Sequence, residues 1–169
     1  YAQGGGALII QSLGALNISA PVYPLLVISN SATSVGGALW VGDYATATVA
    51  GAVHFTGNSA VLGGAIMASN HAVLTLIPTN GLAPLFIGNA AVNNGGAINL
   101  MATSRVHAVN CTFRENTAGS FGGAIRNMQS YLHIVPDFAQ AAGAPPSLLA
   151  NNTAVYGGAI HSYQAPQTL

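Results

Sequence analysis

Charged residues are nearly missing from this chain of 169 residues, and lysine is absent altogether. Three arginines and three acidic residues make up 4% of the chain, against about 25% in an ordinary soluble domain. Nucleic-acid binding draws its affinity from basic side chains that displace counterions, and anionic membranes attract basic patches in the same way. We therefore expect neither nucleic acid nor an acidic membrane surface as a partner.

Cysteine and long hydrophobic runs are also scarce. The single cysteine, Cys111, excludes an intrachain disulfide and any metal site built from cysteines. Apolar residues make up 51% of the chain. However, Gly, Ser, Asn, Thr or Pro interrupts every apolar run before it reaches the ~18 residues of a membrane-spanning helix. We expect no transmembrane segment.

One tetrapeptide recurs along the whole chain. Gly-Gly-Ala followed by Leu or Ile occurs six times, starting at Gly5, Gly36, Gly63, Gly95, Gly122 and Gly157, with spacings of 31, 27, 32, 27 and 35 residues. A second element precedes five of these copies. It is an apolar residue three positions before an asparagine, with an alanine two positions after it; the asparagines are Asn30, Asn58, Asn89, Asn116 and Asn152. Such a period is typical of a solenoid, with one structural unit per repeat.

The residues between the motifs favour strands over helices. A Gly-Gly pair in every repeat would cost each helix about 2 kcal/mol relative to alanine. The intervening segments are rich in β-branched and aliphatic residues, as in 46–53, 72–77, 105–113 and 131–135. The sequence therefore predicts an all-β fold, a parallel β-helix of about five to six coils of 27–35 residues, in which residues 1–169 form a single solenoid domain.

Stacking of the coils gives the motif residues their expected roles. Neighbouring coils lie ~4.8 Å apart, so equivalent residues form columns. We expect the glycine pairs to form corners, where they supply positive φ without a Cβ. We expect the asparagines to adopt the left-handed conformation at another corner and to form a ladder of amide hydrogen bonds. The corner glycines are Gly36, Gly37, Gly63, Gly64, Gly95, Gly96, Gly122, Gly123, Gly157 and Gly158.

The two motifs together resemble the paired Gly-Gly-Ala-(Ile/Leu/Val) and Phe-x-x-Asn signatures of the polymorphic outer membrane protein repeats. Val27 and Leu149 stand where the family has phenylalanine. The resemblance implies a right-handed parallel β-helix at a cell surface, acting as an adhesive or structural stalk. It also implies an extracellular location.

The repeat pattern runs to both ends of the sequence without a polar cap. Uncapped coils expose unpaired backbone groups and apolar interior residues. Two interpretations remain open: the chain is a piece of a longer solenoid, or it is a subunit that stacks head to tail into a filament. A net charge near zero would not oppose such self-association.

Two sets of surface residues are candidate sites. Asn17, Asn110 and Asn151 begin Asn-x-Ser/Thr sequons and are candidates for covalent glycans. Separately, the residue after each Leu or Ile of the motif is expected to point outward, and it is apolar in the first half of the chain, at Ile9, Trp40 and Met67. This strip predicts either a lateral contact with another protomer or a cover of loops from the same chain.

Catalytic chemistry has little support in the sequence. The polysaccharide lyases and hydrolases that use this architecture need clustered charges, but the three acidic residues fall in different coils, at Asp43, Glu115 and Asp137. Glu115 follows Arg114 and is expected to form an exposed ion pair. His107 and His133 lie 12 and 11 residues after the first glycine of their repeats and are candidates for adjacency. We predict no catalytic residue, no cofactor and no metal site.

These observations favour a non-enzymatic, extracellular structural protein, a segment of a surface fibre assembled by axial stacking. The alternative is a fragment of an adhesin passenger domain that binds cell surfaces.

Overall fold

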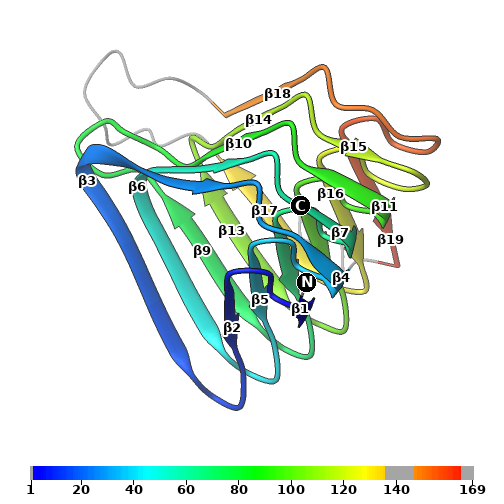
Figure 1. The fold of residues 1–169 in the computed structure, drawn as a ribbon, viewed down its shortest axis with the longest axis horizontal. Coiled ribbons are helices and arrows are strands. Elements are labelled where there is room, and N and C mark those ends of the chain that lie inside the picture. The colour runs from blue at the N-terminus through cyan, green and yellow to red at the C-terminus, as the bar shows by residue number, and fades with distance from the viewer. Residues whose placement is uncertain (1, 136–146, 165–169) are drawn as a thin grey trace.

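The computed structural model describes residues 2–135 and 147–164. They form a parallel β-solenoid of about five turns, which confirms the predicted fold class (Figure 1). The described residues include no helix. Three stacked parallel sheets run along the solenoid, and the chain visits each sheet once in every full turn.

Sheets A and B flank the Gly-Gly corner. Sheet A has five strands and precedes the corner: β1 (Ala2–Gly4), β4 (Ala32–Val35), β7 (Ser59–Leu62), β11 (Ala90–Asn94) and β15 (Thr117–Ala118). Sheet B has six strands and follows it: β2 (Leu8–Ile10), β5 (Leu39–Val41), β8 (Ile66–Ala68), β12 (Ile98–Leu100), β16 (Ile125–Met128) and β19 (Ile160–Tyr163).

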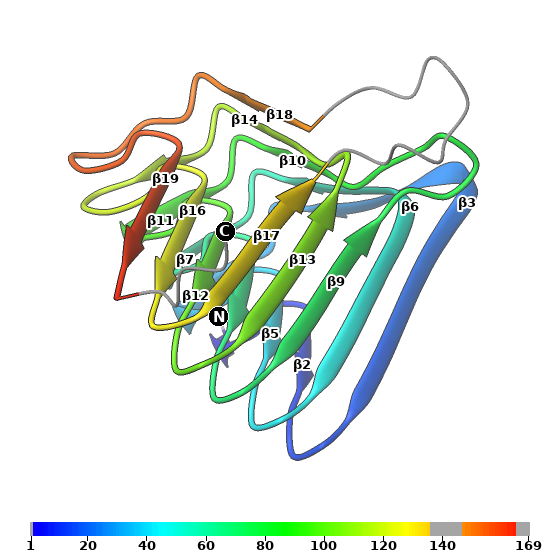
Figure 2. The same cartoon turned by 180° about the vertical axis from the view of Figure 1, so that it is seen from behind.

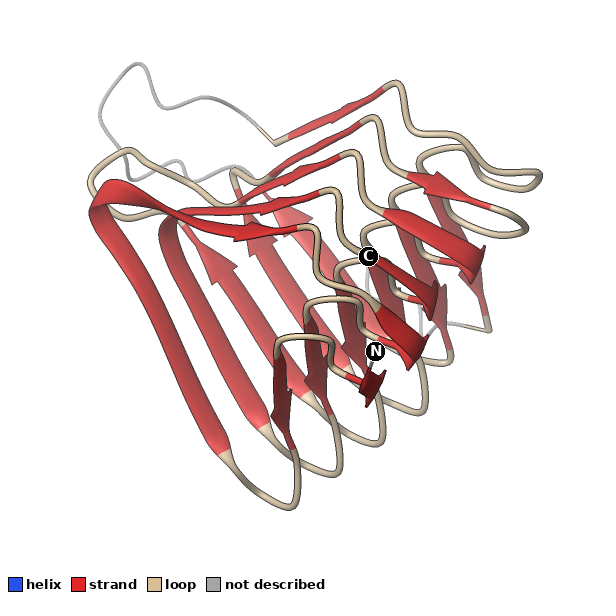
Figure 3. Ribbon diagram, viewed as in Figure 1, coloured by secondary structure: helices blue, strands red, loops and turns tan. Residues whose placement is uncertain are grey.

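Sheet C has eight strands and forms the broad face seen in Figure 2. Its first two strands are long and unbroken, and its later coils are each split into two strands (Figure 3). The long strands are β3 (Ala15–Ile28) and β6 (Thr46–Thr56). The first halves of the split coils are β9 (Val73–Ile77), β13 (Arg105–Val109) and β17 (Tyr131–Val135), and the second halves are β10 (Leu85–Ile87), β14 (Thr112–Arg114) and β18 (Leu148–Ala150). The strand expected over 105–113 is thus interrupted at Asn110 and Cys111, where Asn110 has a positive φ of 53°.

The motif copies lie directly over one another. In sheet B the Leu/Ile residues of all six copies are paired in register, from Leu8 with Leu39 to Ile125 with Ile160. In sheet C the phenylalanine position is likewise in register in five consecutive coils, at Val27, Phe55, Phe86, Phe113 and Leu149. Each motif column predicted from the sequence is therefore a physical column in the solenoid.

The core is a continuous apolar shaft along the solenoid axis. The rings of Phe55, Phe86 and Phe113 stack with centroid separations of 4.9 and 4.8 Å, and all three are fully buried. Burying one such side chain stabilises a fold by about 1.5–3 kcal/mol. The shaft is completed by the buried Leu/Ile column and by alanines whose small side chains fit beside the corners.

Candidate functional site

The five motif asparagines form one hydrogen-bonded ladder inside the solenoid. At Asn89, Oδ1 accepts hydrogen bonds from both the backbone N–H and Nδ2 of Asn58, each 3.0 Å long. The Asn89 Nδ2 in turn donates to the backbone oxygen of Phe55, at 2.9 Å, and to Oδ1 of Asn116, at 2.9 Å. Asn58, Asn89 and Asn116 are fully buried. The Phe-x-x-Asn pattern therefore places a side-chain amide inside the solenoid, where its hydrogen bonds join three successive coils.

The left-handed corner residue is the one before each ladder asparagine, which differs from the expectation. Positive φ occurs at the preceding positions, which are Ser29, Gly57, Gly88, Glu115 and Asn151. The ladder asparagines themselves are not among the positive-φ residues. The physical reason is that the preceding residue turns the chain, so that the asparagine side chain can point inward and bond along the axis.

The two glycines of each pair have different roles. The first one, such as Gly95 with φ of 65°, adopts the left-handed conformation that side chains disfavour. The second, such as Gly96, is not in that region, but a Cβ there would overlap with the backbone oxygen of Gly123 in the next coil. The corner thus needs one glycine for its backbone conformation and one for close stacking.

The predicted outward strip is largely covered by the chain itself. Met67 is only 3% exposed and Trp40 is half-buried, with its Nε1 donating to Ser69 Oγ at 3.1 Å. Ile9, in the first coil, remains 50% exposed. Trp40 packs beside Gly4, where an added Cβ would lie 2.6 Å from its ring. Met67 is therefore closed to a lateral partner, and at Trp40 the neighbouring residues belong to strands β1 and β4 of sheet A.

The same column becomes polar in the later coils. Asn99 is fully buried, and its Nδ2 lies 3.2 Å from Met67 Sδ. Phe121, from the residues just before the Gly-Gly corner, lies over Arg126 and His161, at 5.6 Å from the guanidinium and 4.6 Å between the rings. Burial lowers the pKa of Arg126 below its ordinary value.

The three sequon asparagines occupy different environments. Asn17 is exposed on β3, and Asn151 is exposed at a corner. Asn110 is 3% exposed, so its side chain is not accessible in the folded chain. A modifying enzyme could therefore reach two of the three sequons on the native protein.

The two acidic residues that the structure describes, Asp43 and Glu115, lie at different corners of the repeat and do not form a pair. Asp43 lies at the corner between sheets B and C, where Gln11 and Asn70 donate hydrogen bonds to it at 3.2 and 2.9 Å. Glu115 forms the expected exposed ion pair with Arg114, with Nε and Oε1 3.3 Å apart. Asp137 lies outside the described residues.

Histidine and cysteine complete the reactive groups. His107 and His133 are brought together on neighbouring strands, with their Nδ1 atoms 3.1 Å apart. Cys111 is buried at the break between β13 and β14, and this burial raises the pKa of its thiol to about 12. Within residues 2–135 and 147–164, no group of three or more His, Cys, Asp or Glu side chains is positioned to hold a metal ion.

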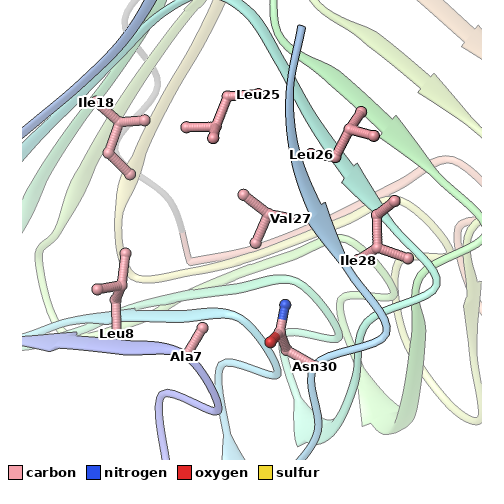
Figure 4. A pocket seen from close by; sticks show the side chains of 8 residues that line it. All are labelled: Ala7, Leu8, Ile18, Leu25, Leu26, Val27, Ile28 and Asn30. Carbon is pink, nitrogen blue, oxygen red and sulfur yellow. The ribbon is translucent and has the colours of Figure 1, made fainter.

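The axial face of the first coil is an apolar surface that the repeat pattern leaves uncovered. Leu8 and Leu25 are 42% and 44% exposed, whereas their register partners Leu39 and Val53 are 1% and 0% exposed. Figure 4 shows these side chains around a hollow that Ile18, Val27 and Asn30 also line. The columns of the shaft therefore end here in apolar side chains that face along the axis.

Together, the fold and the ladders define a β-solenoid scaffold. Residues 110–127 match the Chlamydia polymorphic membrane protein repeat, and this segment contains one copy of both motifs, with Phe113, Asn116 and the Gly122 corner. The chain therefore carries repeats of the polymorphic membrane protein type, as the sequence predicted. No curated protein and no solved structure matches it. Among the residues that the structure describes, no helix is long and apolar enough to span a membrane.

Proposed function

We propose that this chain is a non-enzymatic structural segment of an extracellular surface fibre, in which solenoids stack end to end along their axes. The repeat type supports a surface location, since the matching family is that of a membrane protein repeat of Chlamydia. The observation that carries the proposal is the axial face of the first coil. There the side chains at the end of the core columns are exposed, and they are positioned to continue each column into an added coil.

The columns supply the physical basis for stacking. An added coil at this face would cover Leu8 and Leu25 as the first coil covers their register partners Leu39 and Val53 in the second coil, which are 1% and 0% exposed. It would also continue the parallel ladder of sheet C on β3, which is an edge strand here and pairs only with β6 among the described strands. Apolar burial and edge-strand pairing both favour such an association, and a net charge of zero leaves little repulsion to oppose it.

Sedimentation velocity and negative-stain electron microscopy of the purified chain test the proposal. We expect concentration-dependent assemblies that elongate along the solenoid axis. The matched variants are Leu25→Asp and Leu26→Asp, which place the same charge at adjacent positions of β3. Leu25 is paired with the buried Val53 and points to the same side of β3 as Val27. Leu26 also borders the hollow, but it is paired with the half-buried His54 and points to the other side of the strand (Figure 4).

We expect Leu25→Asp to abolish the assemblies and Leu26→Asp to leave them intact. Monomers of the unmodified chain at all concentrations would contradict stacking between copies. If those monomers also bind to cell surfaces, the adhesin function replaces the fibre function. Loss of assembly in Leu26→Asp but not in Leu25→Asp would show that the outer face, and not the axial face, makes the contact.

We propose further that Asn17 and Asn151 carry N-glycans where the chain passes through a eukaryotic secretory pathway. Both are exposed, whereas Asn110 is buried. Intact-mass measurement of secreted material, before and after enzymatic deglycosylation, tests this. Loss of one glycan mass in each of Asn17→Gln and Asn151→Gln supports it, and an unmodified mass of the parent chain contradicts it.

A further inference from the structure

The geometry of His107 and His133 points to a metal site, and we propose that this pair chelates a first-row transition-metal ion of the Zn²⁺, Ni²⁺ or Cu²⁺ class. The sequence alone led us to expect no metal. The repeat spacing made the two histidines candidates for adjacency, and the proposal rests on the distance between their rings, which the folded solenoid fixes.

The solenoid holds the two histidines on adjacent strands. β13 and β17 are parallel and pair in register, with His107 opposite His133 (Figure 2). The neighbours of His107 in its strand, Val106 and Ala108, are buried, so strand alternation directs the imidazole to the outer face. His133 is exposed on the same face. Both rings are therefore accessible to an ion from solvent.

The separation of the two nitrogen atoms fits chelation. The Nδ1 atoms are 3.1 Å apart, and the ring centroids are 5.1 Å apart. Zinc binds histidine nitrogen at about 2.0–2.1 Å, so two nitrogens on one ion lie about 3.3 Å apart at a tetrahedral angle and about 2.9 Å apart at a right angle. The observed separation lies between these values. Small rotations of the two exposed rings would direct both lone pairs to one ion.

Ligand chemistry selects the metal class. Imidazole nitrogen binds Zn²⁺, Cu²⁺ and Ni²⁺ well, whereas Mg²⁺ and Ca²⁺ prefer oxygen ligands. Without a metal, the short nitrogen contact requires one ring to donate an Nδ1 proton to the other. A metal ion replaces that shared proton, and water fills its remaining positions.

The residues around the histidine pair limit its affinity for a metal ion and set the number of ions bound per chain. Arg105 lies two residues before His107, and its guanidinium sits 5.0 Å from the centroid of the Tyr131 ring, so a positive charge lies near the site. No third His, Cys, Asp or Glu joins the pair among the described residues. We therefore expect one ion per chain, bound more weakly than at a structural site with four protein ligands.

Isothermal titration calorimetry of the full chain with ZnCl₂ tests the proposal. The variants are His107→Gln, His133→Gln and their combination, with His54→Gln as a matched control because His54 lies on sheet C away from the pair. We expect one Zn²⁺ per chain, a fall in affinity of about tenfold or more in each single variant, and little further loss in the double variant, since chelation needs both rings. His54→Gln should bind as the parent chain does.

A second readout is the electron paramagnetic resonance spectrum with Cu²⁺ at one equivalent, which should show coupling to two nitrogen nuclei in the parent chain. Circular dichroism verifies that each variant is folded. The proposal is overturned if the parent chain does not bind Zn²⁺ up to about 1 mM, if the pair variants bind as well as the parent, or if His54→Gln loses as much affinity as they do.

Discussion

Replacing Asn89 by alanine would test whether the asparagine ladder stabilises the solenoid. The substitution removes the bonds of one buried amide. The backbone N–H and Nδ2 of Asn58 lose their acceptor, and the carbonyl of Phe55 loses a donor. Each buried group left unsatisfied costs about 1–3 kcal/mol. Oδ1 of Asn116 also loses one donor but keeps the backbone N–H of Asn89. With the other three groups each left short of a partner, we expect the free energy of unfolding to fall by roughly 3–9 kcal/mol.

Urea unfolding followed by circular dichroism measures this loss. For a chain of this length the loss corresponds to a fall in melting temperature of roughly 10 °C or more. Asn93→Ala is the control, since Asn93 is exposed in the neighbouring strand β11, and a surface change of this kind costs about 0.5 kcal/mol or less. A loss below about 1 kcal/mol in Asn89→Ala, or equal losses in the two variants, would refute the reasoning.

The packing also makes predictions at the corners, in the core and at Cys111. Gly96→Ala places a Cβ against the Gly123 backbone. In Gly88→Ala the new Cβ has no atom within 4 Å, but the alanine must adopt the left-handed φ of 61°. Urea titration should therefore show a loss of about 1 kcal/mol for Gly88→Ala and a clearly larger loss, or no soluble folded protein, for Gly96→Ala. Phe86→Ala opens the aromatic stack and should cost about 3–5 kcal/mol in the same assay, and a loss below ~1 kcal/mol would show that the stack repacks. Cys111 should react with a thiol reagent such as DTNB only after unfolding, because burial raises its pKa to about 12; rapid labelling of the native chain would contradict this. The unfolded thiol ionises first, so stability should fall as the pH rises above about 8.5.

The repeat was readable from the sequence because each copy must satisfy the same constraint. Identical coils stack at a fixed spacing, so a residue that fits one corner must fit all of them. The Gly-Gly pairs, the Leu/Ile column and the phenylalanine position were therefore visible as regular spacings, and the register of the strands confirms the columns. The match of residues 110–127 to a known repeat falls on one copy of this pattern.

Other features were not readable because they depend on how sheets pack. Strand alternation placed Met67 on the outside, but its side chain is only 3% exposed in the folded chain and lies 3.2 Å from Asn99 Nδ2 in the next coil. The left-handed corner was assigned to the asparagines, yet it belongs to the preceding residue, whose identity varies from Ser29 to Glu115. A column with varied residues gives no repeat signal, although its backbone conformation is the same in every coil.

By itself, the sequence determined the repeat unit, the strand-rich coil and the residues that point into the core, because these follow from local conformation and from periodicity. Only the tertiary structure decided which surfaces stay accessible and which reactive groups meet. The repeat spacing made His107 and His133, 26 residues apart in the chain, candidates for adjacency, and the register of β13 and β17 confirms it and fixes their Nδ1 atoms 3.1 Å apart. The physical reason is that residues one coil apart in the sequence contact each other along the solenoid axis. The loops between coils differ in length and therefore set which residues of neighbouring strands pair.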